Sequence, residues 1–123
     1  VACETYNDTT QFGAGVYRYN GSSWMDTGLA SQLQDVDIVT GIGIAERISG
    51  TGLYAGAAYK TTSATYFLEL WEYDGSSWQQ IGPDVDLAAA ADSISIALDS
   101  SDRPVIMYAD SDTGDVTIVA YRQ

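Results

Sequence analysis

The acidic run at residues 110–115, with the sequence DSDTGD, has the residue types and spacing closest to those of a metal site. Its carboxylates belong to Asp110, Asp112 and Asp115, and carboxylate oxygens are the hard ligands that Ca²⁺ prefers. The run lacks the further carboxylate and the distant glutamate of a calcium-binding EF-hand loop. A solvent-exposed hairpin turn is the alternative interpretation. The sequence indicates no cofactor other than Ca²⁺.

Four aromatic residues at repeated positions form a second candidate site: Tyr19, Trp24, Tyr73 and Trp78. Large flat rings of this kind can stack on sugars, as aromatic faces do in lectins. They are also large apolar anchors that pack well between structural elements. Because the four residues recur at matching places in the chain, packing between successive structural units is the competing interpretation.

Catalytic residues are scarce. The chain has no histidine, which excludes Ser-His-Asp and Cys-His catalysis, histidine-ligated zinc and imidazole acid–base chemistry. Glu69 and Glu72 are three positions apart, so on a strand they point to opposite faces and make a poor glycosidase pair. The GIG sequence at residues 41–43 is followed by Glu46 where a dinucleotide fingerprint requires glycine. We therefore expect a protein that is not an enzyme.

Both asparagines of the chain, Asn7 and Asn20, lie in N-glycosylation sequons. Asn20 has an alternative role as a turn residue, because Asp74 takes its place in the second copy of the repeat described below. Cys3 is the only cysteine, so it forms no disulfide within the chain. A small buried thiol is the simplest expectation for it.

The charge balance narrows the range of partners. The chain has five basic and 17 acidic residues, which gives a formal net charge of −12. Nucleic acids and anionic lipids are bound through basic patches, so neither is an expected partner. No apolar run approaches the length of about 18 residues that a membrane-spanning helix needs. The sequons and the near-absence of lysine favour an extracellular or cell-surface location.

The chain repeats itself. Residues 17–24 (YRYNGSSW) recur as residues 71–78 (WEYDGSSW), and each copy is followed by a glycine, Gly28 or Gly82. A third copy begins at residues 119–121, and the DVD sequence of residues 35–37 recurs at residues 84–86. We interpret the DVD segments as polar linkers with the valine facing inward, or alternatively as a cation-binding or capping element between repeats. The DVD copies are 49 residues apart and the hairpin copies 54, because the first repeat carries about five additional residues between Gly28 and Asp35. A period of about 49 residues is typical of repeat architectures.

Each period is predicted to contain four strands. Tyrosine, tryptophan and valine suit pleated, half-buried surfaces, and the Asn-Gly and Asp-Gly pairs fit a hairpin with a type I′ turn. The alternation of residues 93–98 places Ile94, Ile96 and Leu98 on one face of a strand. Its counterpart lies within residues 39–48, where Gly41 and Gly43 would let a neighbouring element approach closely. The other strands are expected at residues 2–6, 14–19, 22–28, 53–59, 66–73, 76–82, 104–108 and 116–122.

Residues 66–73 are apolar on both sides: Phe67, Trp71 and Tyr73 on one face, and Tyr66, Leu68 and Leu70 on the other. A strand buried on both faces belongs to a sheet that lies between two others. The repeated YDGSSW segment and the alternating strand resemble those of secreted prokaryotic β-propeller repeat proteins. The resemblance implies an all-β fold of four-stranded antiparallel blades, stacked face to face. One β-repeat domain over residues 1–123 would then hold about two and a half blades: a partial blade at 1–28, a full blade at 35–82 and a partial blade at 84–123.

The predicted ten strands are too few to close a propeller, which usually needs four to eight blades. Incomplete blades would expose apolar faces and open strand edges that favour association. We therefore expect a structural or surface module that forms a homo-oligomer, a ring or a filament, in which neighbours complete the partial blades. The alternatives are a glycan-binding propeller and a piece of a longer propeller chain.

Overall fold

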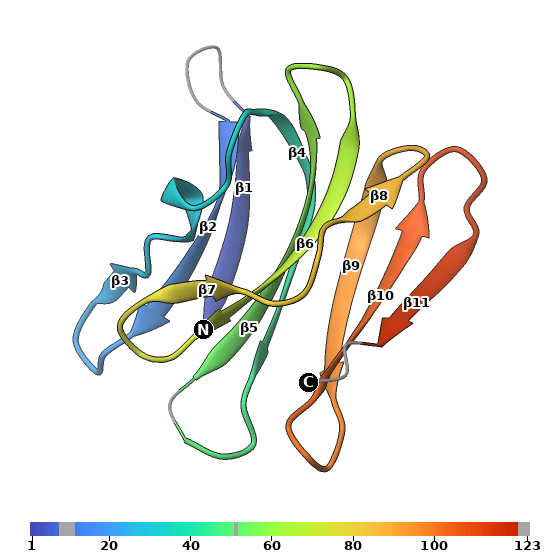
Figure 1. Ribbon diagram of the computed structural model, residues 1–123. Helices are drawn as coiled ribbons and strands as arrows, with labels where there is room; N and C mark the ends of the chain where they lie inside the picture. The colour runs from blue at the N-terminus through green and yellow to red at the C-terminus, as the bar shows by residue number, and fades with distance from the viewer. Residues whose placement is uncertain (8–11, 51, 121–123) are drawn as a thin grey trace.

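The computed structural model describes residues 1–7, 12–50 and 52–120, which form three antiparallel sheets (Figure 1). The first sheet contains β1 (Ala2–Asn7), β2 (Phe12–Tyr19) and β3 (Trp24–Asp26). The middle sheet contains β4 (Val36–Glu46), β5 (Leu53–Thr61), β6 (Tyr66–Tyr73), β7 (Trp78–Gln80) and β8 (Val85–Leu87). The third sheet contains β9 (Ala91–Leu98), β10 (Pro104–Asp110) and β11 (Val116–Ala120). The all-β prediction is confirmed.

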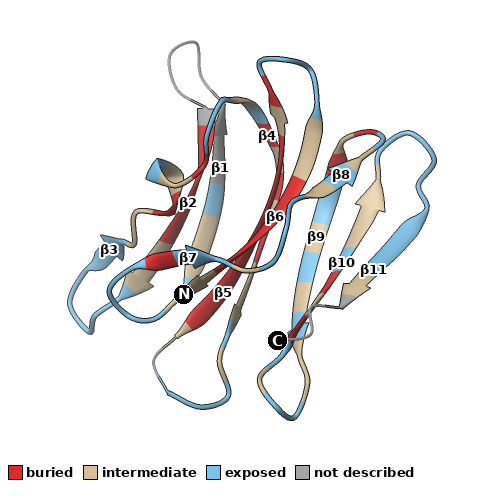
Figure 2. Ribbon diagram, viewed as in Figure 1, coloured by how far each residue is buried: buried red, intermediate tan, exposed pale blue. Residues whose placement is uncertain are grey.

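The three sheets lie in a row, with the middle sheet between the other two (Figure 1). One apolar cluster joins the first sheet to the middle sheet and includes Val16, Ala55 and Trp71. A second cluster joins the middle sheet to the third and includes Leu70 and Ile106. Figure 2 shows the buried positions concentrated on β5 and β6, and exposed positions along β11. The row does not close into a ring within the described residues, so ring closure stays a prediction.

Strand β6 is buried on both faces, as its sequence predicted. Trp71 belongs to the cluster shared with the first sheet, and Phe67 and Tyr73 pack against that cluster. Leu68 and Leu70, on the opposite face, are completely buried in the cluster shared with the third sheet. The middle sheet therefore derives its stability from both neighbours, since fully burying one such side chain contributes about 1.5–3 kcal/mol.

Two glycines of β4 allow the third sheet to approach closely. A Cβ atom at Gly41 would lie 2.8 Å from the Ala91 carbonyl oxygen, and one at Gly43 would lie 2.8 Å from that of Ile94. Both separations are shorter than van der Waals contact, so any larger residue would push β9 away. The close approach predicted at these glycines is confirmed, and β9 is the element that makes it.

The hairpins that connect β2 to β3 and β6 to β7 have the same turn, and it is not the predicted type I′. That turn needs positive φ at both central residues, but only the glycines adopt it: Gly21 has φ 101° and Gly75 has φ 107°. The residue before each glycine acts through its side chain instead. Asn20 Oδ1 accepts hydrogen bonds from the backbone N–H groups of Ser22 and Ser23, both at 3.0 Å. The return strands therefore begin at Trp24 and Trp78, two residues later than predicted.

Strand β8 was not predicted. The segment of residues 84–86, interpreted as a linker, contributes to a short strand that pairs Val85 with Leu68 and Leu87 with Tyr66. Strand β7 pairs with the other end of β6, so β7 and β8 together form an interrupted outer strand of the middle sheet. Val85 and Leu87 pack against the second core cluster. The earlier DVD segment differs, because Val36 begins β4.

The additional residues of the first repeat fill the space between the first and middle sheets. They form a short 3₁₀ helix, η1 (Leu29–Ser31), directly after Gly28, which has φ 80°. Leu29 is completely buried and Leu33 nearly so, and both belong to the first core cluster.

The β4–β5 turn and the β9–β10 turn are joined by Asp102. Its carboxylate accepts hydrogen bonds from the backbone N–H of Ile48 at 2.7 Å and from the backbone and hydroxyl of Ser49. The Tyr54 hydroxyl donates to the Asp102 carbonyl at 3.1 Å. These bonds hold the middle and third sheets together at one end.

None of the helical segments in the described part of the chain has the length and apolar character needed to cross a membrane.

Candidate functional site

The two equivalent hairpins place their aromatic residues in different surroundings. Tyr73 and Trp78 contact each other with ring centroids 5.0 Å apart, and both pack against the first sheet. The Trp78 indole Nε1 donates a hydrogen bond to the Thr27 carbonyl at 3.0 Å. Tyr19 and Trp24 form the same kind of pair at 5.4 Å but are 52% and 56% exposed.

Of the four predicted site residues, Trp78 therefore packs between sheets, as the competing interpretation expected. It is only 8% exposed and cannot offer a free ring face to a sugar. Trp24 lies on the face of the first sheet that points away from the middle sheet. Within the described part of the chain, a neighbouring sheet covers Trp78 and none covers Trp24.

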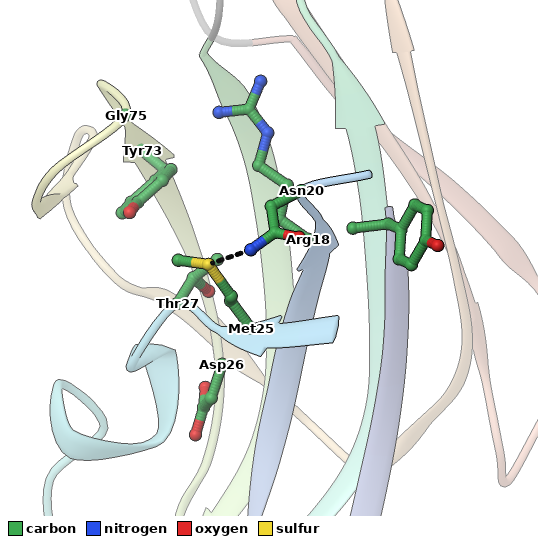
Figure 3. A pocket seen from close by; sticks show the side chains of 8 residues that line it. Arg18, Asn20, Met25, Asp26, Thr27, Tyr73 and Gly75 are labelled. Atoms are coloured by element: carbon green, nitrogen blue, oxygen red, sulfur yellow. Dashed lines mark hydrogen bonds between the residues drawn. The ribbon is translucent and has the colours of Figure 1, made fainter. Parts of the chain in front are cut away.

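A cavity of about 340 Å³ lies where the two hairpins meet (Figure 3). Arg18 and Met25 are cross-strand partners on β2 and β3, and they reach it from the first sheet. Tyr73 and Gly75 reach it from the middle sheet. The rest of the lining comes from Tyr19, Asn20, Asp26 and Thr27. The cavity thus brings together two of the predicted site residues, Tyr19 and Tyr73, with polar residues that the sequence analysis did not select.

The polar groups of this cavity differ in how far they are already engaged. The Asn20 amide nitrogen donates to Met25 Sδ at 3.1 Å (Figure 3), and its oxygen maintains the hairpin turn. One carboxylate oxygen of Asp26 accepts from the Gly28 N–H at 2.8 Å, which leaves the other available. Arg18 forms no ion pair, whereas the other described cationic side chains, Arg47, Lys60 and Arg103, each have a carboxylate partner.

The predicted calcium site has the hydrogen bonds of a hairpin turn. Asp110 Oδ1 accepts from the backbone N–H groups of Asp112 at 2.8 Å and Thr113 at 3.0 Å. Gly114 adopts φ 73° and closes the turn by donating to the Asp110 carbonyl. Asp112 and Asp115 are exposed. Over residues 1–7, 12–50 and 52–120, no three Asp, Glu, Cys or His residues are arranged to hold a metal ion.

The two sequon asparagines lie in different elements. Asn7 ends β1, next to residues that lie outside the described part of the chain. Asn20 is exposed, and its amide forms the turn in the same way as the Asp74 carboxylate of the second hairpin. The turn role of Asn20 is therefore confirmed, and glycosylation stays a prediction for both residues.

A buried carboxylate lies between the first and middle sheets. Glu69 accepts hydrogen bonds from the Tyr59 hydroxyl at 2.6 Å and from the Trp71 indole at 2.9 Å, and it is only 7% exposed. Burial and the bond to Glu69 raise the pKa of Tyr59 far above its usual range. Glu72 lies on the opposite face of β6 and pairs with Arg47. Glu69 and Glu72 lie on opposite faces of the strand, so the structure does not bring these two carboxylates together for acid–base chemistry.

A second cavity of about 240 Å³ lies on the outer face of the third sheet. Met107, Ala109 and Val116 contribute apolar groups to it, and Ser93 and Ser95 lie at its other side. Met107 is 44% exposed, and its cross-strand partner Ile118 is 65% exposed. Isolated apolar side chains are common on surfaces, but contiguous apolar patches mark sites of interaction.

No family model, curated protein or solved structure matches this chain. The geometry of the structure itself gives the candidate sites: the cavity between the hairpins, and the outer faces of the first and third sheets.

Proposed function

We propose that the protein is a non-enzymatic, extracellular structural module with β-propeller-type repeats, and that it self-associates. A second copy of the chain covers the outer face of the third sheet. The proposal rests on a match between two faces. The exposed outer face of the third sheet resembles the face of the middle sheet that the third sheet covers.

The match can be followed residue by residue in the strand pairing. Ala58 pairs with Leu68 in the middle sheet, and Met107 pairs with Ile118 in the third. Ala58 and Met107 each directly precede a tyrosine on the second strand of their sheet. Ala58 and Leu68 are completely buried beneath the third sheet, whereas the equivalent pair is exposed. The third sheet thus presents the apolar surface that its neighbour uses for stacking.

Both faces also grade from small to large side chains. On the middle sheet the gradient runs from Gly41 and Gly43 on β4, through Ala58 on β5, to Leu68 and Leu70 on β6. On the third sheet it runs from Ser95 and Ala97 on β9, through Met107 on β10, to Ile118 on β11. Sheets that approach closely at one edge and diverge at the other stack as a fan. This is the arrangement of propeller blades, and it supports the propeller-type assignment.

The first sheet offers the complementary surface. Trp78 of the middle sheet inserts toward the first sheet and bonds to its main chain. Trp24 has the equivalent position on the first sheet and is exposed. The surface around Trp24 would therefore contact the third sheet of another copy, in the same way that each sheet contacts the one before it. Such head-to-tail contacts form a ring if the rotation closes and a filament if it does not.

The amino-acid composition supports the remaining parts of the proposal. The absence of histidine removes the commonest acid–base catalyst, and the acidic, lysine-poor chain with two sequons suits an extracellular protein. A net charge of −12 opposes association at low ionic strength. Salt screens such repulsion, so the contact should strengthen as salt is added.

Sedimentation velocity on the isolated chain tests the proposal. We expect the wild-type chain to associate reversibly, and Ile118→Lys to shift it to monomer. Ile48→Lys is the matched control, because Ile48 is 71% exposed but lies in the turn between β4 and β5, outside the stacking face. A wild-type chain that is folded and monomeric at all concentrations would contradict self-association. It would favour instead a further sheet from a longer chain as the natural cover.

A further inference from the structure

We propose that the cavity between the two hairpins binds the carboxylate of an acidic saccharide, such as a hexuronate, through Arg18. This inference goes beyond assembly and does not depend on it. The cavity lies between the first and middle sheets of one chain and not on either outer face.

The charge of Arg18 is the first reason. Among the described residues it is the one basic side chain without an ion pair, in a chain that carries 17 acidic residues. A guanidinium is always charged at physiological pH, and its planar group of N–H donors matches a carboxylate in bidentate geometry. An unpaired guanidinium that lines a cavity can therefore bind an anionic ligand from outside the chain.

The other lining residues specify what else the ligand carries. Tyr73 is half-buried and presents an aromatic ring, which suits the apolar face of a sugar ring. The Asp26 carboxylate points away from Arg18 and Tyr73 and accepts from the Gly28 N–H of its own turn, so it leaves the Arg18 charge uncompensated (Figure 3). Arg18 and Tyr73 together suit a ligand that carries an anionic group beside an apolar ring face, as a hexuronate does.

The size of the cavity agrees with this class. A volume of about 340 Å³ is at the small end of the range for ligand pockets, about 300–1,000 Å³. One or two sugar rings fit a space of this size, and a long oligosaccharide would extend out of its open side.

Within the described residues, the second hairpin does not repeat this site. The second hairpin has Glu72 at the position of Arg18, and Glu72 is already paired with Arg47. It also has Gln79 and Gln80 in place of Met25 and Asp26. We therefore expect one acidic-saccharide site per chain.

An NMR titration of the ¹⁵N-labelled chain with glucuronate, and separately with glucose, tests the inference. Glucuronate should cause saturable shifts of backbone amides around residues 18–27 and 73–75, and glucose should bind at least about tenfold more weakly because it lacks the charge-assisted bond. Arg18→Met should weaken glucuronate binding by about tenfold, whereas Lys60→Met, which changes the net charge equally at the far end of β5, should leave it unchanged.

Three results would overturn the inference: no saturable shifts with glucuronate, equal affinity for glucose, or wild-type affinity in Arg18→Met. If Arg18→Met does not give the spectrum of a folded protein, the location of the shifts in the wild-type chain decides. Shifts outside the cavity contradict the assignment.

Discussion

The indole nitrogen of Trp78 donates a hydrogen bond to the carbonyl of Thr27, 51 residues earlier in the chain. This bond joins the second hairpin to the first, and it is part of the packing of one repeat against the preceding one. Trp24 has the same place in the first hairpin, but no sheet among the described residues covers it, and it is therefore exposed. The Trp78 contact is thus formed within the chain, whereas the equivalent surface around Trp24 is exposed.

The two tryptophans should contribute very differently to stability. Trp78→Ala should lower the free energy of unfolding by about 3–5 kcal/mol, as is usual for a buried tryptophan. Trp24→Ala should change it by less than about 1 kcal/mol in the monomeric chain, because an exposed side chain loses little on truncation. Urea unfolding followed by circular dichroism measures both values. Equal losses would show that Trp78 does not have the packing role assigned to it.

The close contact at Gly43 should not tolerate a methyl group. In Gly43→Ala the new Cβ would lie 2.8 Å from the Ile94 carbonyl oxygen, so β9 must move. We expect a loss of about 1–3 kcal/mol in unfolding free energy. Ser95→Ala, on the exposed face of β9, is the control and should change stability by less than about 0.5 kcal/mol. An unchanged denaturation midpoint in Gly43→Ala would contradict the close packing of β4 and β9.

The strands with clear alternation could be predicted from the sequence, because side chains on a strand point alternately to its two faces. The two-sided burial of β6 and the inward face of Ile94, Ile96 and Leu98 follow from that rule alone. Strand β8 could not be predicted, because aspartate is depleted in strands and its pairing depends on the free edge of β6. The turn type was wrong because Asn20 and Asp74 form the turn through their side chains, and not through positive φ.

The cavity between the hairpins was also beyond prediction, because Arg18 and Tyr73 are far apart in the sequence and no local pattern joins them. The one available signal was a departure from the repeat, with arginine at residue 18 where the second copy has Glu72. The different exposure of Trp24 and Trp78 was equally hidden. It depends on which sheets have neighbours, and the tyrosine and the GSSW residues are the same in both hairpins.

Acid should destabilise the second hairpin through Asp74. Hydrogen bonds from the backbone of Ser77 and Ser76, and from the Ser76 hydroxyl, lower the pKa of Asp74 to about 2. A lowered folded-state pKa gives stability that is present above the unfolded value of about 3.9 and is lost as the pH falls toward 2. Asp74→Asn should reduce this acid dependence and keep the turn, because Asn20 forms the same turn in the first hairpin.

Denaturation midpoints measured through the acid range test this expectation. Part of the acid dependence should remain in Asp74→Asn, since the bond from the Arg103 side chain also lowers the pKa of Asp99 to about 2. An identical pH profile for the wild-type and Asp74→Asn chains would contradict the role of the carboxylate.

Alkaline conditions should destabilise the core between the first and middle sheets. Burial and the bond to Glu69 raise the pKa of Tyr59 well above its usual value. A raised folded-state pKa gives stability that is complete below the unfolded value of about 10 and is lost as the pH rises above it. Tyr59→Phe should be less stable at neutral pH by about 1–3 kcal/mol, because Glu69 loses a donor, and should depend less on alkaline pH.

Tyr19→Phe is the control for the loss of a tyrosine hydroxyl, because Tyr19 is exposed and contacts Trp24 at the surface. At neutral pH its free energy of unfolding should match that of the wild-type chain. A Tyr59→Phe chain with the wild-type alkaline profile would place the titrating group elsewhere.

Mixing two monomeric variants tests the head-to-tail stacking of sheets most directly. Ile118→Lys disables the outer face of the third sheet, and Trp24→Lys disables the outer face of the first. Each variant alone should sediment as a monomer, and an equimolar mixture should form a 1:1 dimer, because one intact face of each kind remains. If either variant associates alone, or if the mixture stays monomeric while the wild-type chain associates, the two faces do not bind each other and the account is contradicted.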